Sequence, residues 1–222
     1  MRSTLNESTQ ASSSASTRQQ GRRPRDDSVD IRQQIMDAAI ELFAQQGYAA
    51  TSIRQIADGV GVNSAMVHYY FGSKEALLYE VMDQSLEPLV EAISAMKQKK
   101  EAPLREFVSL VLGVFARKPQ LPILMTREVF LPGGVMQKHF KEHFAPRLGG
   151  ALPQLLSVEQ SEGHLRDDVD PGLVAQTLFG LCAFPFISRS MAEPVLGVSY
   201  SKNGMQEIER HIMELLERGF LS

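Results

Sequence analysis

The chain has 222 residues, enough for one or two domains with a sizeable hydrophobic core, and a formal net charge of −3. This slightly acidic balance excludes a protein that binds polyanions over its whole surface. Cys182 is the single cysteine, which excludes an intrachain disulfide, and its apolar neighbours predict a buried thiol. No segment has the length of a membrane span and the N-terminus lacks the apolar run of a signal peptide, so we expect a cytoplasmic protein with no membrane partner.

The first 26 residues are rich in Ser, Thr and Gln and are expected to form a disordered basic arm. Five arginines oppose a single glutamate within residues 1–25, which gives this segment a charge of +4. Such an arm suits contact with phosphates or with a minor groove. A solvated tail is the alternative interpretation.

A first helix is expected from about Ser28 to Gln46, because its apolar residues recur on one face, and Gly47 closes it. The next stretch, from Thr51 to Lys74, predicts two short helices joined by a tight turn at Gly61. Either Thr51 or Ser52 can cap the first of them. The second is capped by Asn63 or Ser64 and runs to about Tyr70.

This layout indicates a helix-turn-helix, whose second helix fits the major groove of DNA. Its inward side is Val67, Tyr70 and Phe71, and the remaining side chains are small, polar or aromatic and carry no acid. An ordinary helical hairpin with a glycine turn is the alternative. Ten residues are candidates for DNA contact, with the helix-flanking ones on phosphates and those of the second helix on bases or sugars: Thr51, Ser52, Asn63, Ser64, Ala65, Met66, His68, Tyr69, Tyr70 and Lys74.

Residues 31–82, about a quarter of the chain, resemble the N-terminal domain of the TetR family of bacterial transcriptional regulators. The matching positions occur in order: Ile35, Ala38, Ala39, Leu42, Phe43, Gly47, Tyr48, Thr51, Ile56, Ala57, Gly61, Val62, Tyr70, Phe71, Ser73, Lys74, Glu75 and Leu77. His68 and Met66 depart from the residues that the family more often has, tyrosine and threonine, so the resemblance does not define the DNA sequence that is read.

The resemblance implies an all-α protein with a three-helix head at residues 27–72, a connecting helix at 73–100, and a ligand-binding and dimerisation domain at 101–222. A fourth helix beginning at Ser73 carries an apolar face, and Pro88 is expected to kink or break it. One hypothesis is that a bend at Pro88 relays ligand occupancy to the head. A passive kink is the alternative.

In the second domain, helices are expected from Pro103 to about Lys118, from Pro122 to Phe130, and from Val135 to Val158 with breaks near residues 146–153. The pair Asp170 and Pro171 starts another helix, with a capping side chain followed by a proline that needs no donor. This helix is apolar nearly all round, and the final one, from about Ser201 to Arg218, carries one apolar stripe.

The last two of these helices predict a homodimer, with an intrachain core as the alternative. The candidate interface residues are Leu173, Leu181, Met205, Ile208, Ile212 and Leu215. A ligand pocket is expected between helices of this domain, where aromatic residues and methionine could equally be plain core. Its candidate lining residues are Phe107, Leu110, Val114, Met125, Phe130, Phe140, Phe144, Leu178 and Phe184. Arg127 and Glu128 could anchor a charged group of a ligand or form an exposed ion pair.

The expected function is that of a repressor which binds a palindromic double-stranded DNA operator as a dimer, and which a small, largely apolar effector releases. A transcriptional activator of the same fold is an alternative, and no cofactor is expected. A metal-dependent enzyme is the other alternative, because His139 and His143 lie one helical turn apart. Lys138 and Lys141 place positive charge beside them, so a solvated helical face accounts for this pair better.

Overall fold

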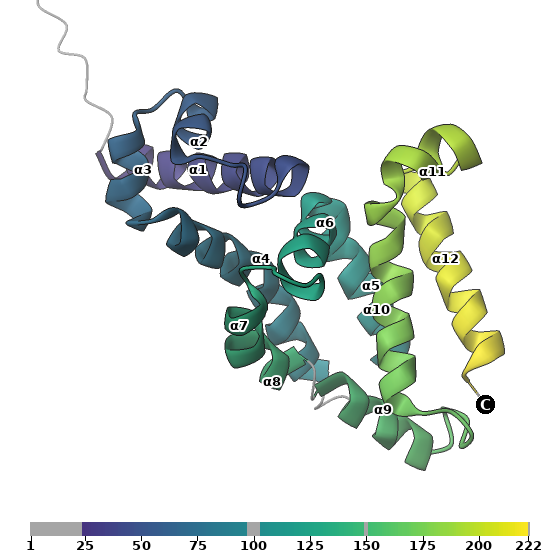
Figure 1. The fold of residues 1–222 in the computed structure, drawn as a ribbon. Coiled ribbons are helices and arrows are strands. Elements are labelled where there is room, and N and C mark those ends of the chain that lie inside the picture. The colour runs from purple at the N-terminus through teal and green to yellow at the C-terminus, as the bar shows by residue number, and fades with distance from the viewer. Residues whose placement is uncertain (1–23, 97–102, 149–150, 222) are drawn as a thin grey trace, which may run out of the picture.

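The computed structural model describes residues 24–96, 103–148 and 151–221. Within these ranges, all elements of regular secondary structure are helices (Figure 1). A lone pairing of Leu165 with Leu221 is the one β-bridge of this described part. The helices are α1 (Pro24–Gln46), α2 (Ile53–Val60), α3 (Ser64–Phe71), α4 (Lys74–Met96), α5 (Pro103–Arg117), α6 (Gln120–Met125), η1 (Thr126–Phe130), α7 (Gln137–His139), η2 (Phe140–Phe144), α8 (Ala145–Leu148), α9 (Ala151–Ser161), α10 (Pro171–Ile187), α11 (Arg189–Leu196) and α12 (Lys202–Gly219).

The first three helices form a small head at one end of the molecule (Figure 1). α1 packs against α2 and α4, and α3 packs against α2 and α4. Ile35, Phe43, Ile56 and Val67 are fully buried where these helices meet. α1 begins at Pro24, so residues 24–26, which were expected in the disordered arm, are helical. The remainder of the predicted arm lies outside the described residues.

α4 runs from the head into the rest of the protein as one helix of 23 residues with Pro88 inside it. Of the kink or break expected at Pro88, the break is therefore wrong, and the kink stays a prediction. Side-chain contacts support the helix in the turn just before the proline. Ser85 Oγ donates to the Val81 carbonyl at 2.6 Å and accepts from Lys118 Nζ at 3.2 Å. Glu87 forms a two-pronged ion pair with Arg147.

The second domain is a bundle in which α10 packs against α5, α6 and α9, while α12 packs against α5. Asp170 caps α10 through the Leu173 amide at 2.9 Å, as predicted. Pro185 lies inside α10 and Pro153 inside α9 without ending either helix, which corrects the break expected at 153. α11 was not predicted, because its eight residues contain Pro194 and end at Gly197.

Two helices of the bundle, η1 and η2, are π-helices of five residues. Such wide turns are rare and are often found at functional sites. Cys182 is fully buried on α10, so the predicted buried thiol is confirmed, and burial raises the pKa of this thiol to about 12. Within the described ranges, no single helix is both long and apolar enough to cross a membrane.

Candidate nucleic-acid interface and ligand cavity

The turn between α2 and α3 is built by local caps at both of its ends. Ser52 Oγ accepts from the Gln55 amide at 3.2 Å, and the Gln55 side chain accepts from the Ser52 amide at 2.8 Å, which completes a capping box. Gly61 ends α2 with φ of 76°, a left-handed conformation that glycine adopts without a steric penalty. The Val62 amide then donates to the Ala57 carbonyl at 3.0 Å and reverses the chain.

α3 presents one face to the interior and the other to solvent. Asn63 caps it by accepting from the Met66 amide at 2.9 Å, and Val67 and Phe71 anchor it in the head. Ala65, His68 and Tyr69 are exposed, and Tyr69 is 83% accessible. Ser64, Met66 and Tyr70 are half-buried at the margins of this surface. The exposed face of α3 contains no acidic side chain, so it does not repel a phosphate backbone.

His68 is oriented by the end of its own helix. Its Nδ1 lies 3.0 Å from the Gly72 carbonyl oxygen, which can only accept, so Nδ1 carries the proton. The neutral ring then keeps Nε2 as a hydrogen-bond acceptor. An acceptor at this position pairs with the exocyclic amino groups of adenine or cytosine.

Thr51 was expected to contact a phosphate, and the structure corrects this. The side chain is 1% exposed, and its hydroxyl donates to the Gly47 carbonyl at 2.8 Å. It also lies within hydrogen-bond distance of the Leu42 carbonyl and the Gln46 side-chain amide. These partners lie at the end of α1, so Thr51 fixes the link between α1 and α2.

Lys74 was also expected to contact phosphate as a free cation. Its Nζ instead donates to the carbonyls of Tyr48 and Thr51, at 2.8 and 2.7 Å, and lies 4.1 Å from the centre of the Tyr48 ring. The ammonium therefore ties the start of α4 to the α1–α2 link. Two of its three donors are used in this way.

An apolar cavity of about 710 Å³ lies inside the second domain. This volume falls within the usual range of small-molecule sites. Gln176 is the one polar side chain among the lining residues, which are Leu89, Ile93, Phe107, Val111, Phe115, Met125, Phe130, Phe140, Ala145, Leu148, Leu152, Pro153, Gly172, Ala175, Gln176, Phe179 and Gly180.

The lining includes four of the predicted residues: Phe107, Met125, Phe130 and Phe140. The other five lie elsewhere. Leu178 and Phe144 are buried in the core, Val114 of α5 is buried there as well, Leu110 of α5 is partly buried against it, and Phe184 is 64% exposed. On α10 the prediction chose the wrong face: Gly172, Gln176 and Phe179 recur at helical spacing on the cavity side, and Leu178 lies beside this row.

Arg127 and Glu128 connect the bundle to the head and have neither of the roles expected for them. Arg127 Nη1 donates to the carbonyls of Ala44 and Gln45, both at 3.0 Å, at the C-terminal end of α1. Glu128, which is 8% exposed, accepts from the Tyr48 amide at 3.1 Å. We call these contacts the α1 latch. Sequence reasoning missed it because the partners are backbone groups about 80 residues away.

The α1 latch and the cavity share one short helical segment. Arg127 and Glu128 belong to η1, and Phe130 of the same π-helix lines the cavity together with Met125 just before it. The Phe130 ring also packs edge-on against Phe179 at 5.1 Å. A ligand that displaces Phe130 would therefore act on the helix that holds α1.

A second hollow, of about 1040 Å³, lies along α10, α11 and α12. Three of the predicted interface residues line this hollow and are at least partly exposed to solvent: Leu181, Ile208 and Leu215. Ile212 also reaches this hollow but is 4% exposed and belongs mainly to the intrachain core, which corrects its assignment. Met205 is half-buried. We call the large exposed apolar side chains of these three helices the exposed apolar face: Leu173, Phe184, Met191, Val195, Leu196 and Leu215.

The two histidines of the enzyme alternative are engaged in packing. His139 stacks on Tyr79 and on His143, with ring centres 4.3 Å apart in each case. His139 Nε2 lies 2.8 Å from Asp83, and His143 Nδ1 lies 3.1 Å from the His139 carbonyl. Among the residues that the structure describes, no group of three metal-binding side chains forms around this pair.

A head with an outward-facing, capped second helix, joined to a bundle with an apolar cavity, defines the class of helix-turn-helix transcriptional regulators. Residues 35–81 match the family model described as bacterial regulatory proteins, tetR family. The chain is 25% identical to the HTH-type transcriptional repressor NicS of Pseudomonas putida over 85% of this chain and 91% of that protein. It is 34% identical to the regulator RutR of Escherichia coli over 43% of this chain and 46% of that protein.

The fold also matches a solved structure of the fatty acid degradation regulator FadR from Bacillus halodurans. The TM-score is 0.66 with 22% identity, over 85% of this chain and 95% of that one. Residues 35–81 are therefore a DNA-binding domain of the TetR family, and the chain as a whole is similar to transcriptional regulators. It is a DNA-binding regulator of transcription and not an enzyme, which removes the metal-dependent alternative.

Proposed function

We propose that the protein is a ligand-responsive repressor that binds a palindromic operator as a homodimer and is released by a small, largely apolar effector. The observation that carries this proposal is the shared segment at η1, where Phe130 lines the cavity and Arg127 and Glu128 hold α1. An occupant of the cavity then has a direct route to the orientation of the head. The assignment as a repressor rests on the similarity to NicS, which is a transcriptional repressor.

The proposed DNA surface is the outward face of α3 with the caps beside it. Ala65, His68 and Tyr69 face the bases or sugars, and the half-buried Ser64, Met66 and Tyr70 lie at the edge of the same surface. Ser52 and Asn63 cap the two helices and lie at its phosphate-facing side. Lys74 contributes its third donor, and Thr51 supports the surface without touching DNA.

The proposed effector is an apolar molecule with at most one polar end. Aromatic and aliphatic side chains form almost all of the cavity wall, and Gln176 is available for one hydrogen bond. A charged anchor on Arg127 is not part of the proposal, because its guanidinium binds backbone carbonyls of α1. Fatty acyl compounds are the first probes, because the cavity wall is apolar and FadR, which has a similar fold, is a fatty acid degradation regulator.

The test measures binding of the full-length chain to DNA from upstream of its own gene, by fluorescence anisotropy with and without free fatty acids of increasing length. We expect specific binding, its loss on adding the matching chain length, and weaker binding by Tyr69→Ala, which removes an exposed ring without disturbing the core. Ala175→Phe places a ring in the cavity wall and should keep DNA binding while abolishing release. Release that persists in Ala175→Phe would show that the effector acts elsewhere.

A transcription assay separates repression from activation. With a promoter reporter and purified polymerase, the unliganded protein is expected to lower transcript yield, and the effector to restore it. A rise in transcript on adding the unliganded protein would establish the activator instead.

A further inference from the structure

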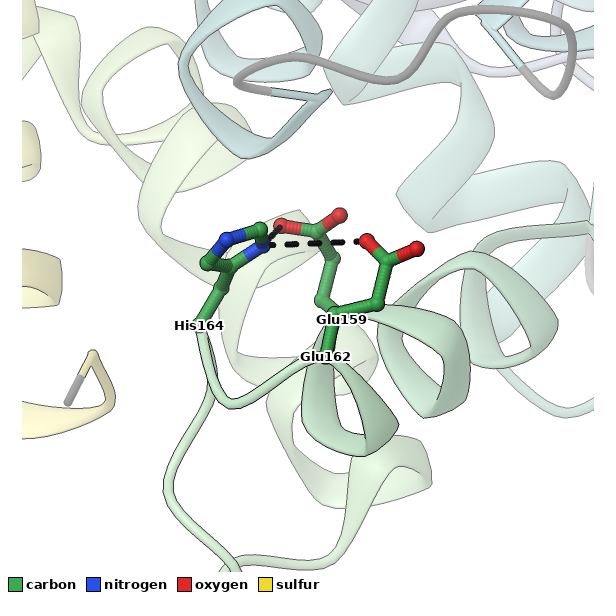
Figure 2. Close-up of side chains that lie close together, drawn as sticks. All are labelled: Glu159, Glu162 and His164. Atoms are coloured by element: carbon green, nitrogen blue, oxygen red, sulfur yellow. Dashed lines mark ion pairs between the residues drawn. The ribbon is translucent and has the colours of Figure 1, made fainter.

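A histidine and two glutamates converge at the end of α9, away from the head and the cavity lining. Glu159 and Glu162 lie three residues apart on the last turn of the helix and beyond it (Figure 2). Gly163 follows with φ of 79°, which turns the chain back. The amides of His164 and Leu165 then donate to the Glu159 carbonyl at 2.9 and 3.2 Å, so the imidazole is folded towards both carboxylates.

The distances fit a shared metal ion better than direct hydrogen bonds. His164 Nδ1 lies 3.4 Å from Glu159 Oε2 and 3.8 Å from Glu162 Oε2, and one ligand atom from each residue lies within 4.8 Å of the other two. A charge-assisted hydrogen bond would bring nitrogen and oxygen to about 2.7–2.9 Å. Two ligands of a tetrahedral zinc ion, each about 2.1 Å from the metal, are about 3.4 Å apart.

The surroundings carry an excess of negative charge. Residues 159–170 contain five acidic side chains and one arginine, which gives −4 with His164 neutral. Arg166 is committed to Asp168, at 2.6 and 2.9 Å, and also donates to the Gly219 carbonyl at 3.2 Å. Its guanidinium therefore does not neutralise Glu159 or Glu162.

The Glu159 carboxyl is the most enclosed of the three groups, with its side chain 12% exposed against 47% for Glu162 and 57% for His164. A half-enclosed carboxylate beside a second one is stabilised by a cation that both can bind.

We propose that Glu159, Glu162 and His164 form a binding site for a divalent transition-metal ion of the zinc type, with water completing the tetrahedron. Imidazole nitrogen and carboxylate oxygen are both ordinary zinc ligands. The ion clamps the end of α9 to the loop before α10. Leu165 pairs with Leu221 and the Arg166 amide donates to the Phe220 carbonyl at 3.0 Å, so the clamp also holds the loop against the end of α12.

The alternative is that no metal binds here and that a protonated His164 forms an ion pair with both glutamates. The two alternatives differ in what a metal does to the folded chain. A ligand that binds the native state raises its stability by mass action. At about 100 times its Kd, such a ligand raises the Tm of a chain of this size by about 5–10 °C.

The experiment titrates zinc chloride into the untagged, metal-stripped full-length protein by calorimetry and follows Tm in parallel, with magnesium chloride as the second ion. We expect one zinc ion per chain, a rise in Tm, and at least a tenfold weaker affinity in both His164→Ala and Glu162→Gln. His143→Ala is the matched control, because it removes an exposed histidine from the other histidine-containing cluster and should leave zinc binding unchanged.

Three results would overturn the site. One is the absence of saturable zinc binding. Another is binding that His143→Ala abolishes and His164→Ala does not. The third is magnesium binding as tight as zinc binding and insensitive to His164→Ala, which would indicate a carboxylate-only surface. His164→Ala and Glu162→Gln alter exposed side chains, so both variants are expected to fold, and unchanged far-UV circular dichroism checks this.

Discussion

At the scale of single residues, the head is held together by side chains that occupy positions typical of DNA contacts. Thr51 is buried against the end of α1, and Lys74 is tethered to the carbonyls of Tyr48 and Thr51. From sequence, both residues flank helix ends and look available to phosphates. Their actual partners are backbone carbonyls of a neighbouring segment, and a sequence pattern does not reveal which carbonyls need a donor.

Replacing Lys74 with alanine is expected to lower stability as well as DNA affinity. The change removes two hydrogen bonds from a charged donor and leaves two carbonyls without that partner, which costs about 1.5–3 kcal/mol in the free energy of unfolding. Thermal melts should show Tm lower by about 3–10 °C. Binding to specific and nonspecific DNA should weaken by a similar factor, measured by anisotropy at several salt concentrations.

Lys74→Arg serves as the control, since it keeps the charge but presents a different donor geometry. An unchanged melting curve combined with a smaller salt dependence of DNA binding would mean that the lysine acts on phosphate alone. A changed sequence preference would contradict both roles.

At the scale of elements, the helices of the head could be predicted well because apolar spacing and caps coincide there. Ser52, Asn63 and Asp170 all form the cap bonds expected of them. The bundle was predicted less accurately for a physical reason. Proline inside a helix costs a hydrogen bond, but packing from neighbouring helices can offset this cost, as at Pro88 and Pro185.

The residues of the candidate site also differ in how well they could be predicted, and for the same reason. Exposed α3 residues could be identified from sequence because a helix-turn-helix has a fixed local geometry. The cavity lining and the α1 latch depend on which faces of distant helices meet, so only part of the lining was found.

Breaking the α1 latch is expected to uncouple the effector from the DNA. Arg127→Ala removes two hydrogen bonds to the end of α1 and leaves the cavity wall intact. Allosteric coupling typically changes affinity by about 5–150-fold. In the variant, the ratio of DNA dissociation constants with and without effector should fall towards one. Anisotropy titrations at saturating effector measure this ratio.

Arg105→Ala is the matched control, because Arg105 pairs with Glu217 on the bundle surface and does not touch the head. It should retain the full effector response. If Arg127→Ala retained the response as well, the signal would have to pass through α4 without the latch.

At the scale of the whole molecule, the exposed apolar face of α10, α11 and α12 is the clearest sign of a second copy. Large apolar patches on a soluble chain usually mark an interface. Two reading heads also need a fixed separation to bind paired half-sites. The intrachain alternative fits Ile212, which is buried, but does not account for Leu173 or Phe184, which are both 64% exposed.

Phe184→Asp is expected to convert the proposed dimer into a monomer with little loss of folding, since the ring is largely exposed in the single chain. Burying a carboxylate at an apolar interface is strongly unfavourable. Light scattering after size exclusion should give half the mass of the parent protein. Operator affinity should fall by about 10²–10⁴-fold, because the second head no longer binds intramolecularly.

Val158→Asp introduces the same charge at a half-exposed position on α9, outside the apolar face, and should remain dimeric. A parent protein of monomeric mass at micromolar concentration would contradict the proposed interface directly.

The unbroken course of α4 has a mechanical consequence. A helix of 23 residues is about 34 Å long, so a rotation of about 5° at its bundle end displaces its far end by about 3 Å. Hydrogen bonds to DNA tolerate errors of only a few tenths of an ångström. In the proposed dimer, a rotation of a few degrees at the ligand end of this helix would therefore be enough to move both heads out of alignment with the duplex.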